Sequence, residues 1–154
     1  YAETRLRLLI LGHNPSEKTW QVGVSYGNPS NRFWPLLRSS GILPPLWRAS
    51  DPLSRINNCM PSELGIGFSD LGCLPGSDAA EFSRSVMLQW RDDFYYRATA
   101  HALRCSKAQS RDSESSVSVT DRYSPHIVAF TGKRQFSLMF DPPLKKVDNF
   151  GKQD

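Results

Sequence analysis

The sequence lacks the cysteine pattern of a disulfide-stabilised or metal-binding protein. Its three cysteines, Cys59, Cys73 and Cys105, are odd in number, widely spaced and free of any C-x-x-C pair. This spacing argues against a disulfide framework, a zinc site and an iron–sulfur cluster. We therefore expect a protein of a reducing compartment that uses no metal and no other cofactor.

Long hydrophobic runs are absent as well. No apolar stretch approaches the roughly 20 residues that a membrane-spanning helix requires, so we expect no membrane association. The charge is mildly basic, with a formal net charge of +4 and a pI near 9.1, which permits a polyanionic partner without requiring one. A length of 154 residues with 39% hydrophobic content predicts one domain, 1–154, large enough to bury a core.

Three short apolar runs predict buried strands. Residues 6–11 (LRLLIL) are too short for a helix and too apolar for a surface strand, which is typical of a parallel strand that ends at Gly12. Residues 65–72 (GIGFSDLG) predict a second short strand, and residues 127–130, ended by Gly132, predict a third that is also buried.

Helical patterns lie between these runs. Apolar spacing predicts helices over residues 33–40, 83–104 and 134–140. Ser30 or Asn31 can cap the first of them. Four prolines break residues 42–65 into turns with room for one short helix, and the serine-rich residues 106–122 predict a mobile insertion. Strands that alternate with helices predict an α/β fold with a central, mainly parallel sheet.

The stretch GHNPS, residues 12–16, follows the first predicted strand and therefore belongs to the ligand-binding edge of such a sheet. It is not a phosphate-binding loop, because the repeated glycines and trailing Lys-Ser/Thr are absent, and its serine is not centred between glycines as in a nucleophile elbow. A rigid Asn14 amide can position a water through its carbonyl and donate to a substrate carbonyl through its nitrogen. The alternative is an asparagine that only closes a turn.

Four segments together carry a family resemblance. GHNPS, then YGNPSNRFW (26–34), GIGFSDL (65–71) and IVAFTGK (127–133) resemble, in order, the conserved blocks of the mismatch-specific uracil/thymine-DNA glycosylase family within the uracil-DNA glycosylase superfamily. The resemblance implies a three-layer α/β fold and a monofunctional, monomeric DNA repair enzyme. Such an enzyme flips a base out of mismatched double-stranded DNA and hydrolyses its N-glycosidic bond. Uracil is the expected base, thymine and other modified bases are further candidates, and the supposed substrate implies a nuclear location.

The resemblance also implies roles for individual residues. Asn14 corresponds to the residue that holds the water attacking the sugar C1′, and Tyr26 to an aromatic ring stacked on the flipped base. Thr19 falls where the pocket surrounds the pyrimidine C5 position. Lys133 and Arg32 are candidates for DNA phosphate contacts, with a plain surface role as the alternative. The implied substrate-binding set is Gly12, His13, Ser16, Thr19, Tyr26, Asn31, Ser69 and Asp70.

Three of these residues depart from the family pattern. Asp70 replaces an asparagine or lysine, and its carboxylate can accept from a base N–H, repel a developing base anion or act as a general base. Ser16 replaces a glycine, which alters the approach of the backbone to the base. His13 replaces an apolar residue and either stabilises negative charge on the departing base or has a packing and hydrogen-bonding role.

Other conspicuous residues have plainer interpretations. Asp92 and Asp93 are neighbours on a predicted helix, point about 100° apart and are expected to form a solvated face rather than a catalytic pair. Phe33 and Trp34 are expected in the core. The resemblance ends before the family's final strand and DNA-insertion loop, so we expect a C-terminally truncated domain. A catalytically impaired, DNA-binding truncated isoform or relic of the same fold is the alternative function.

Overall fold

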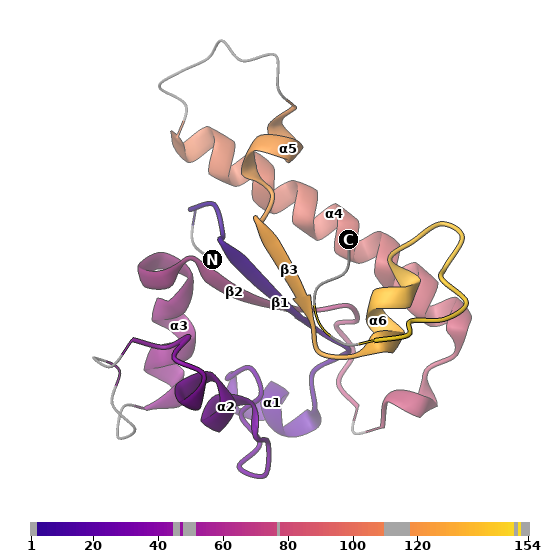
Figure 1. Ribbon diagram of the computed structural model, residues 1–154, viewed down its shortest axis with the longest axis horizontal. Helices are drawn as coiled ribbons and strands as arrows, with labels where there is room; N and C mark the ends of the chain where they lie inside the picture. The colour runs from indigo at the N-terminus through magenta and orange to yellow at the C-terminus, as the bar shows by residue number, and fades with distance from the viewer. Residues whose placement is uncertain are drawn as a thin grey trace.

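The computed structural model describes residues 3–44, 47, 52–76, 78–109, 118–149 and 151. Its centre is a parallel sheet of three strands, β1 (Leu8–Gly12), β2 (Ile66–Asp70) and β3 (Ile127–Phe130), in the order β2-β1-β3. Figure 1 shows β1 between the other two strands. The prediction of an α/β fold with a parallel sheet is confirmed in this form. All three strands run in one direction, so their carboxyl ends meet at one edge.

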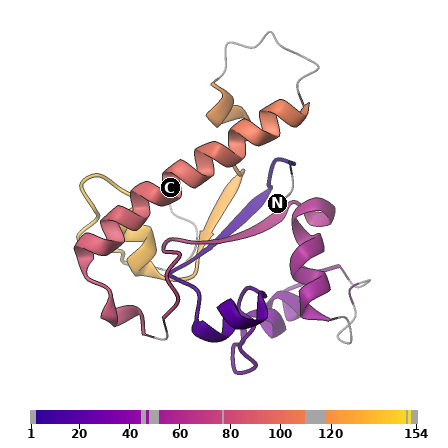
Figure 2. The same ribbon diagram turned by 180° about the vertical axis from the view of Figure 1, so that it is seen from behind.

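Helices cover both faces of the sheet because β1 is apolar on both. Leu9 and Leu11 pack into a core cluster with α4 (Arg84–Gln109) and α6 (Lys133–Leu138), whereas Ile10 packs into a second cluster with α2 (Phe33–Ser39) and α3 (Leu53–Leu64). Figures 1 and 2 show α4 and α6 on one side of the sheet and α1 (Glu17–Val22), α2 and α3 on the other. Alternation along one strand therefore supplies both cores.

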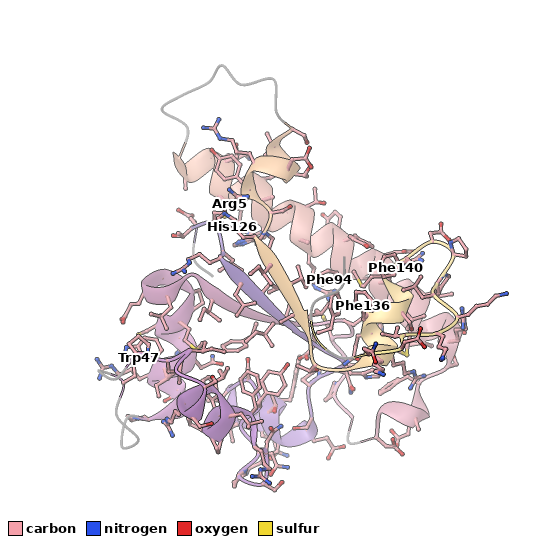
Figure 3. The ribbon with its side chains drawn as sticks, in the orientation of Figure 1. Arg5, Trp47, Phe94, His126, Phe136 and Phe140 are labelled. Carbon is pink, nitrogen blue, oxygen red and sulfur yellow. The ribbon has the colours of Figure 1, made fainter. Side chains whose placement is uncertain are left out.

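The aromatic side chains follow this division. Phe136 on α6 and Phe140 just after it lie on the same side of the sheet as Phe94 of α4, while Trp47 lies near α3 (Figure 3). At the amino ends of the strands, Arg5 donates from Nε to the Ser124 carbonyl at 3.0 Å. The predicted site residues Gly12 and Asp70 lie at the opposite, carboxyl ends of β1 and β2.

Helix α3 is longer than predicted. Residues 42–65 were expected to form turns with one short helix, but Leu53–Leu64 is a helix of 12 residues with Pro61 inside it. Ile56 and Met60, one helical turn apart, are 2% and 0% exposed. Their burial against the sheet offsets the single backbone hydrogen bond that a proline removes. Tertiary packing therefore outweighs the local signal of the proline.

Helix α4 confirms the predicted amphipathic helix and extends it. Its buried residues recur at helical spacing: Met87, Trp90, Phe94, Ala102 and Cys105. The helix continues to Gln109 instead of ending near residue 104, and α5 covers Val119–Tyr123, so both ends of the predicted insertion 106–122 are helical. Residues 110–117 of that insertion lie outside the described residues.

Strand β3 is less buried than predicted. Ile127 is 62% exposed and Val128 is 38% exposed, although the apolar run predicted a buried strand. Within the described part of the chain, β3 pairs with β1 along one edge only. Hydrophobicity alone identifies the strand but does not give its place in the sheet, and an edge strand exposes side chains that a central strand buries.

Candidate functional site

Gly12, the last residue of β1, brings two predicted site residues together. It pairs in register with Asp70 at the end of β2. A Cβ atom at Gly12 would overlap the Oδ1 of Asp70 and would lie 2.9 Å from the hydroxyl oxygen of Tyr26. The absence of a side chain therefore lets the carboxylate and the ring hydroxyl meet over the backbone.

Tyr26 is held rigidly beside this point. Its φ of 55° is in the left-handed region, which non-glycine residues rarely adopt. Its ring stacks on Phe33 with centroids 4.0 Å apart. The turn is further fixed because the Trp34 indole donates to the Ser25 carbonyl at 2.9 Å and the Ser25 amide donates to Asn57 Oδ1 at 3.0 Å. One face of the Tyr26 ring is thus covered by Phe33, and the Phe68 ring lies 6.2 Å away in a T-shaped arrangement.

Asp70 and Tyr26, the two polar groups beside Gly12, both have raised pKa values. Burial raises the pKa of Asp70 from 3.8 to about 6, and the nearby Arg97 offsets part of the rise. Burial and the Asp70 charge raise the pKa of Tyr26 above its ordinary value, so its hydroxyl keeps its proton. That hydroxyl is buried, and the nearby Thr131 side chain offsets part of the rise in its pKa. The site offers a tyrosine donor beside a carboxyl group that titrates near neutral pH.

Arg97 is a member of this site that sequence reasoning missed. From α4 its Nη2 atom donates to the backbone carbonyls of Asp70 at 2.8 Å and Leu71 at 2.9 Å. Its guanidinium carbon also lies 5.9 Å from the Phe94 ring centroid. The sequence places Arg97 on a helix but does not show that the helix crosses the end of β2. No local signal identifies it.

Asn14 holds two loops together. Its Nδ2 donates to the Leu74 carbonyl at 3.1 Å and the Gly76 carbonyl at 3.3 Å, and its Oδ1 lies 2.7 Å from His13 Nδ1. The Gly76 amide in turn donates to the Pro15 carbonyl at 3.1 Å. Protein carbonyls therefore occupy the amide nitrogen, whereas the amide oxygen keeps a lone pair after accepting one hydrogen bond. This geometry favours Asn14 as an acceptor for water over Asn14 as a donor to substrate.

His13 belongs to the other face of the sheet. Its ring lies beside Phe82 and Trp90, with centroid distances of 6.1 Å and 5.9 Å, and those two rings are themselves 4.6 Å apart. Trp90 is part of the α4 cluster, whereas Tyr26 packs against the α2 and α3 cluster. The observed contacts are those of the packing and hydrogen-bonding alternative.

Gln135 is a second residue without a sequence signal. It is 6% exposed, its amide oxygen accepts from the His13 backbone N–H at 3.2 Å, and its amide nitrogen donates to the Gly132 carbonyl at 3.0 Å. This buried side chain joins the start of α6 to the residue before Asn14. A buried, fully bonded amide fixes its partners in place.

Three predicted site residues serve local structure. Ser16 caps α1, because its Oγ accepts from the Thr19 amide at 3.1 Å, and the two hydroxyls lie 3.0 Å apart. Asn31 is exposed, and its Oδ1 accepts from the Phe33 amide at 2.9 Å, but the N-cap position of α2 is Arg32 and not the predicted Ser30 or Asn31. Within the described chain none of the three hydrogen-bonds to Tyr26 or Asp70, and their substrate roles stay predictions.

The remaining predicted residues lie apart from this centre. Ser69 pairs with Leu11, so alternation along β2 directs it to the face opposite Asp70. Arg32 is exposed just before α2. Lys133 at the start of α6 donates from Nζ to the Asp148 carbonyl at 2.8 Å. A DNA contact by Lys133 would have to form alongside or replace this bond.

Other candidate groups do not form a competing centre. Cys105 Sγ lies 3.4 Å from His101 Nε2, but burial raises the pKa of Cys105 and lowers that of His101, so the pair stays neutral rather than forming a thiolate. Asp92 pairs with Arg91 and its side chain is 68% exposed, as predicted for a solvated face. A pocket of about 210 Å³ beside α2 includes Asn31 and Arg38 in its lining.

Among the described residues, no three His, Cys, Asp or Glu side chains lie together as a metal site would need. In the same part of the chain, every helix is too short or too polar to cross a membrane. No protein-family model matches the sequence.

Proposed function

We propose that this chain is a monofunctional DNA glycosylase with a three-layer, uracil-DNA glycosylase-like fold that releases uracil from mismatched double-stranded DNA. The observation that carries the proposal is the meeting of Tyr26 and Asp70 at Gly12, two residues before a rigidly held Asn14. The sequence blocks that resemble the family supply all three residues. Their position at the carboxyl ends of parallel strands is where an α/β sheet binds its ligand.

In the proposed reaction, the flipped base stacks on the Tyr26 ring, and a water is oriented by donating a hydrogen bond to Asn14 Oδ1. The water oxygen forms a bond to C1′ while the bond between C1′ and the base nitrogen breaks. The bonding electron pair leaves with the base, and a water proton passes to solvent or to the base. The base anion is delocalised, so hydrogen-bond donors stabilise it without a strong nucleophile.

Asp70 sets the electrostatic character of this reaction. In its protonated form it donates a hydrogen bond to a base carbonyl and helps stabilise the departing anion. In its ionised form it accepts from a base N–H but repels the anion. The choice among uracil, thymine and other modified bases then depends on Asp70 together with the space around Thr19. A mismatched duplex as partner and a nuclear location belong to the same proposal.

The test uses a labelled duplex with one G·U pair, incubated with the full chain and treated with alkali to cleave abasic sites. Wild type is expected to give the cleaved strand, and Asn14→Ala is expected to lose it. Asn58→Ala, an exposed asparagine on α3, is the matched control and should keep the activity.

DNA binding is measured on the same samples by fluorescence anisotropy at several salt concentrations. Wild-type chain that binds the duplex and forms no abasic product contradicts the glycosylase proposal. Salt-sensitive binding without product would then support the DNA-binding relic of the same fold. Absence of both binding and cleavage refutes both functions.

A further inference from the structure

The orientation of the Asn14 amide is fixed by its nitrogen. The Nδ2 atom faces three backbone carbonyls, those of Leu74, Gly76 and Pro15, at 3.1, 3.3 and 3.4 Å. Exchange of the amide oxygen and nitrogen would set an oxygen against these acceptors. The nitrogen must therefore face residues 74–76, and the oxygen must face His13.

This orientation determines where the His13 ring carries its proton. An amide oxygen only accepts, and Asn14 Oδ1 lies 2.7 Å from His13 Nδ1, so Nδ1 must donate. The other ring nitrogen, Nε2, is buried and has no partner among the described residues. A proton on Nε2 would be an unpaired buried donor beside Phe82 and Trp90, and it would leave Nδ1 without a proton to give to Asn14. The tautomer with its proton on Nδ1 satisfies Nδ1 and leaves only Nε2 unpaired.

The His13 ring is itself immobilised. Phe82 and Trp90, which contact each other, pack beside it, its backbone amide donates to Gln135 at 3.2 Å, and its carbonyl accepts from Gly72 at 2.9 Å. Side chains from α4 and α6 thus hold the histidine, which holds the Asn14 oxygen. A donor held this firmly orients its acceptor without reorganisation during the reaction.

We propose that His13 is a positioning residue that donates from Nδ1 to Asn14 Oδ1 and so directs the free lone pair of that oxygen at the attacking water. The inference rests on the proposed glycosylase function for its catalytic consequence. It assigns Asn14 to the water rather than to recognition of the base. It also gives the histidine of GHNPS a role on the face of the sheet away from Tyr26 and Asp70.

The first experiment measures the tautomer in the free protein. Long-range ¹H–¹⁵N spectra report which imidazole nitrogen carries the proton, and His13→Asn identifies the signals of His13 among the three histidines. The expected result is a proton fixed on Nδ1. A proton on Nε2, or rapid averaging between the nitrogens, overturns the proposal. This measurement does not depend on catalysis.

The second experiment separates positioning from packing with two variants. His13→Asn retains an N–H donor near the position of Nδ1 but leaves the space beside Phe82 and Trp90 partly empty, whereas His13→Leu fills that space without a donor. Single-turnover cleavage of the G·U duplex is expected to fall by roughly 10- to 100-fold in His13→Leu and by less than about threefold in His13→Asn. Thermal stability is expected in the opposite order, with His13→Leu the more stable.

The proposal fails if the two variants rank in the same order by cleavage rate and by thermal stability. If the cleavage rates of the two variants follow their thermal stabilities, His13 acts through packing alone. Wild-type chain that binds the duplex without releasing uracil overturns the proposed function and the catalytic use of His13. In that case, the tautomer still decides whether His13 fixes the Asn14 amide.

Discussion

Asp70→Asn is expected to stabilise the protein at neutral and alkaline pH. The carboxyl group lies against Gly12 and the Tyr26 hydroxyl, where burial disfavours its charge. Asparagine has nearly the same shape and carries no charge. Arg97 keeps its contacts in this variant, because it donates to the backbone carbonyls of residues 70 and 71 and not to the carboxylate. The substitution therefore removes a buried charge and keeps these hydrogen bonds, and it gives up only the charge attraction of Arg97, which offsets part of the burial cost.

The magnitude follows from the acidity of the group. The pKa of Asp70 is raised from 3.8 to about 6, and at roughly 1.4 kcal/mol per pH unit this corresponds to ~3 kcal/mol. The folded state binds the proton more tightly than the unfolded state, so the free energy of unfolding falls as pH rises from 3.8 through about 6. Above that range the full cost is present, and below pH 4 it vanishes.

The assay is urea unfolding of wild type and Asp70→Asn at half-unit steps from pH 4 to pH 8. The variant is expected to be more stable by up to ~3 kcal/mol at pH 8, equivalent to a rise of about 6–12 °C in Tm, and to approach wild type at pH 4. Asp93→Asn, at an exposed position of α4, is the matched control and should show no comparable pH dependence. A difference that is absent at pH 8, of opposite sign, or constant with pH refutes the reasoning.

Two further predictions concern the same end of the sheet. Gly12→Ala is expected to destabilise the fold by about 1–3 kcal/mol in urea unfolding, because its methyl overlaps the Asp70 carboxylate. The double variant with Asp70→Gly should recover part of this loss, and strict additivity would show that the overlap is not the cause. Arg97→Gln is expected to cost about 1–3 kcal/mol, since it removes the donor that bonds the backbone carbonyls of Asp70 and Leu71. Arg84→Gln, exposed on the same helix, should change stability by less than about 0.5 kcal/mol, and equal effects at the two arginines would contradict the assigned contacts.

The local patterns of the sequence were sufficient to predict the three strands and helix α4. Apolar runs ended by glycine predict all three strands, and three- to four-residue spacing predicts α4. The hydrogen bond that Asn31 Oδ1 accepts from the Phe33 amide is also a local feature, since the two residues are only two positions apart. Such interactions need only neighbouring residues, so sequence reasoning can identify them.

Where local signals compete with packing, the sequence misleads. Pro61 suggests a break, but burial of Ile56 and Met60 keeps α3 helical. The apolar character of β3 suggests a buried strand, but its position in the sheet leaves Ile127 exposed. In both cases the outcome depends on which distant segment packs against the element.

The candidate site likewise combines features that the sequence shows with contacts that only tertiary packing decides. The sequence shows residues 13 and 14 and the end of β2 as motifs, yet only the tertiary structure sets Asp70 against Gly12 and the His13 ring beside Phe82 and Trp90. Strand register decides the first contact, and the crossing of α4 over the sheet decides the second. Sequence periodicity fixes which face of an element is apolar, but the pairing of faces is a property of the whole packed core. For that reason the sequence by itself identifies the chain's motifs, while the tertiary structure decides which side chains pack against them and orient them.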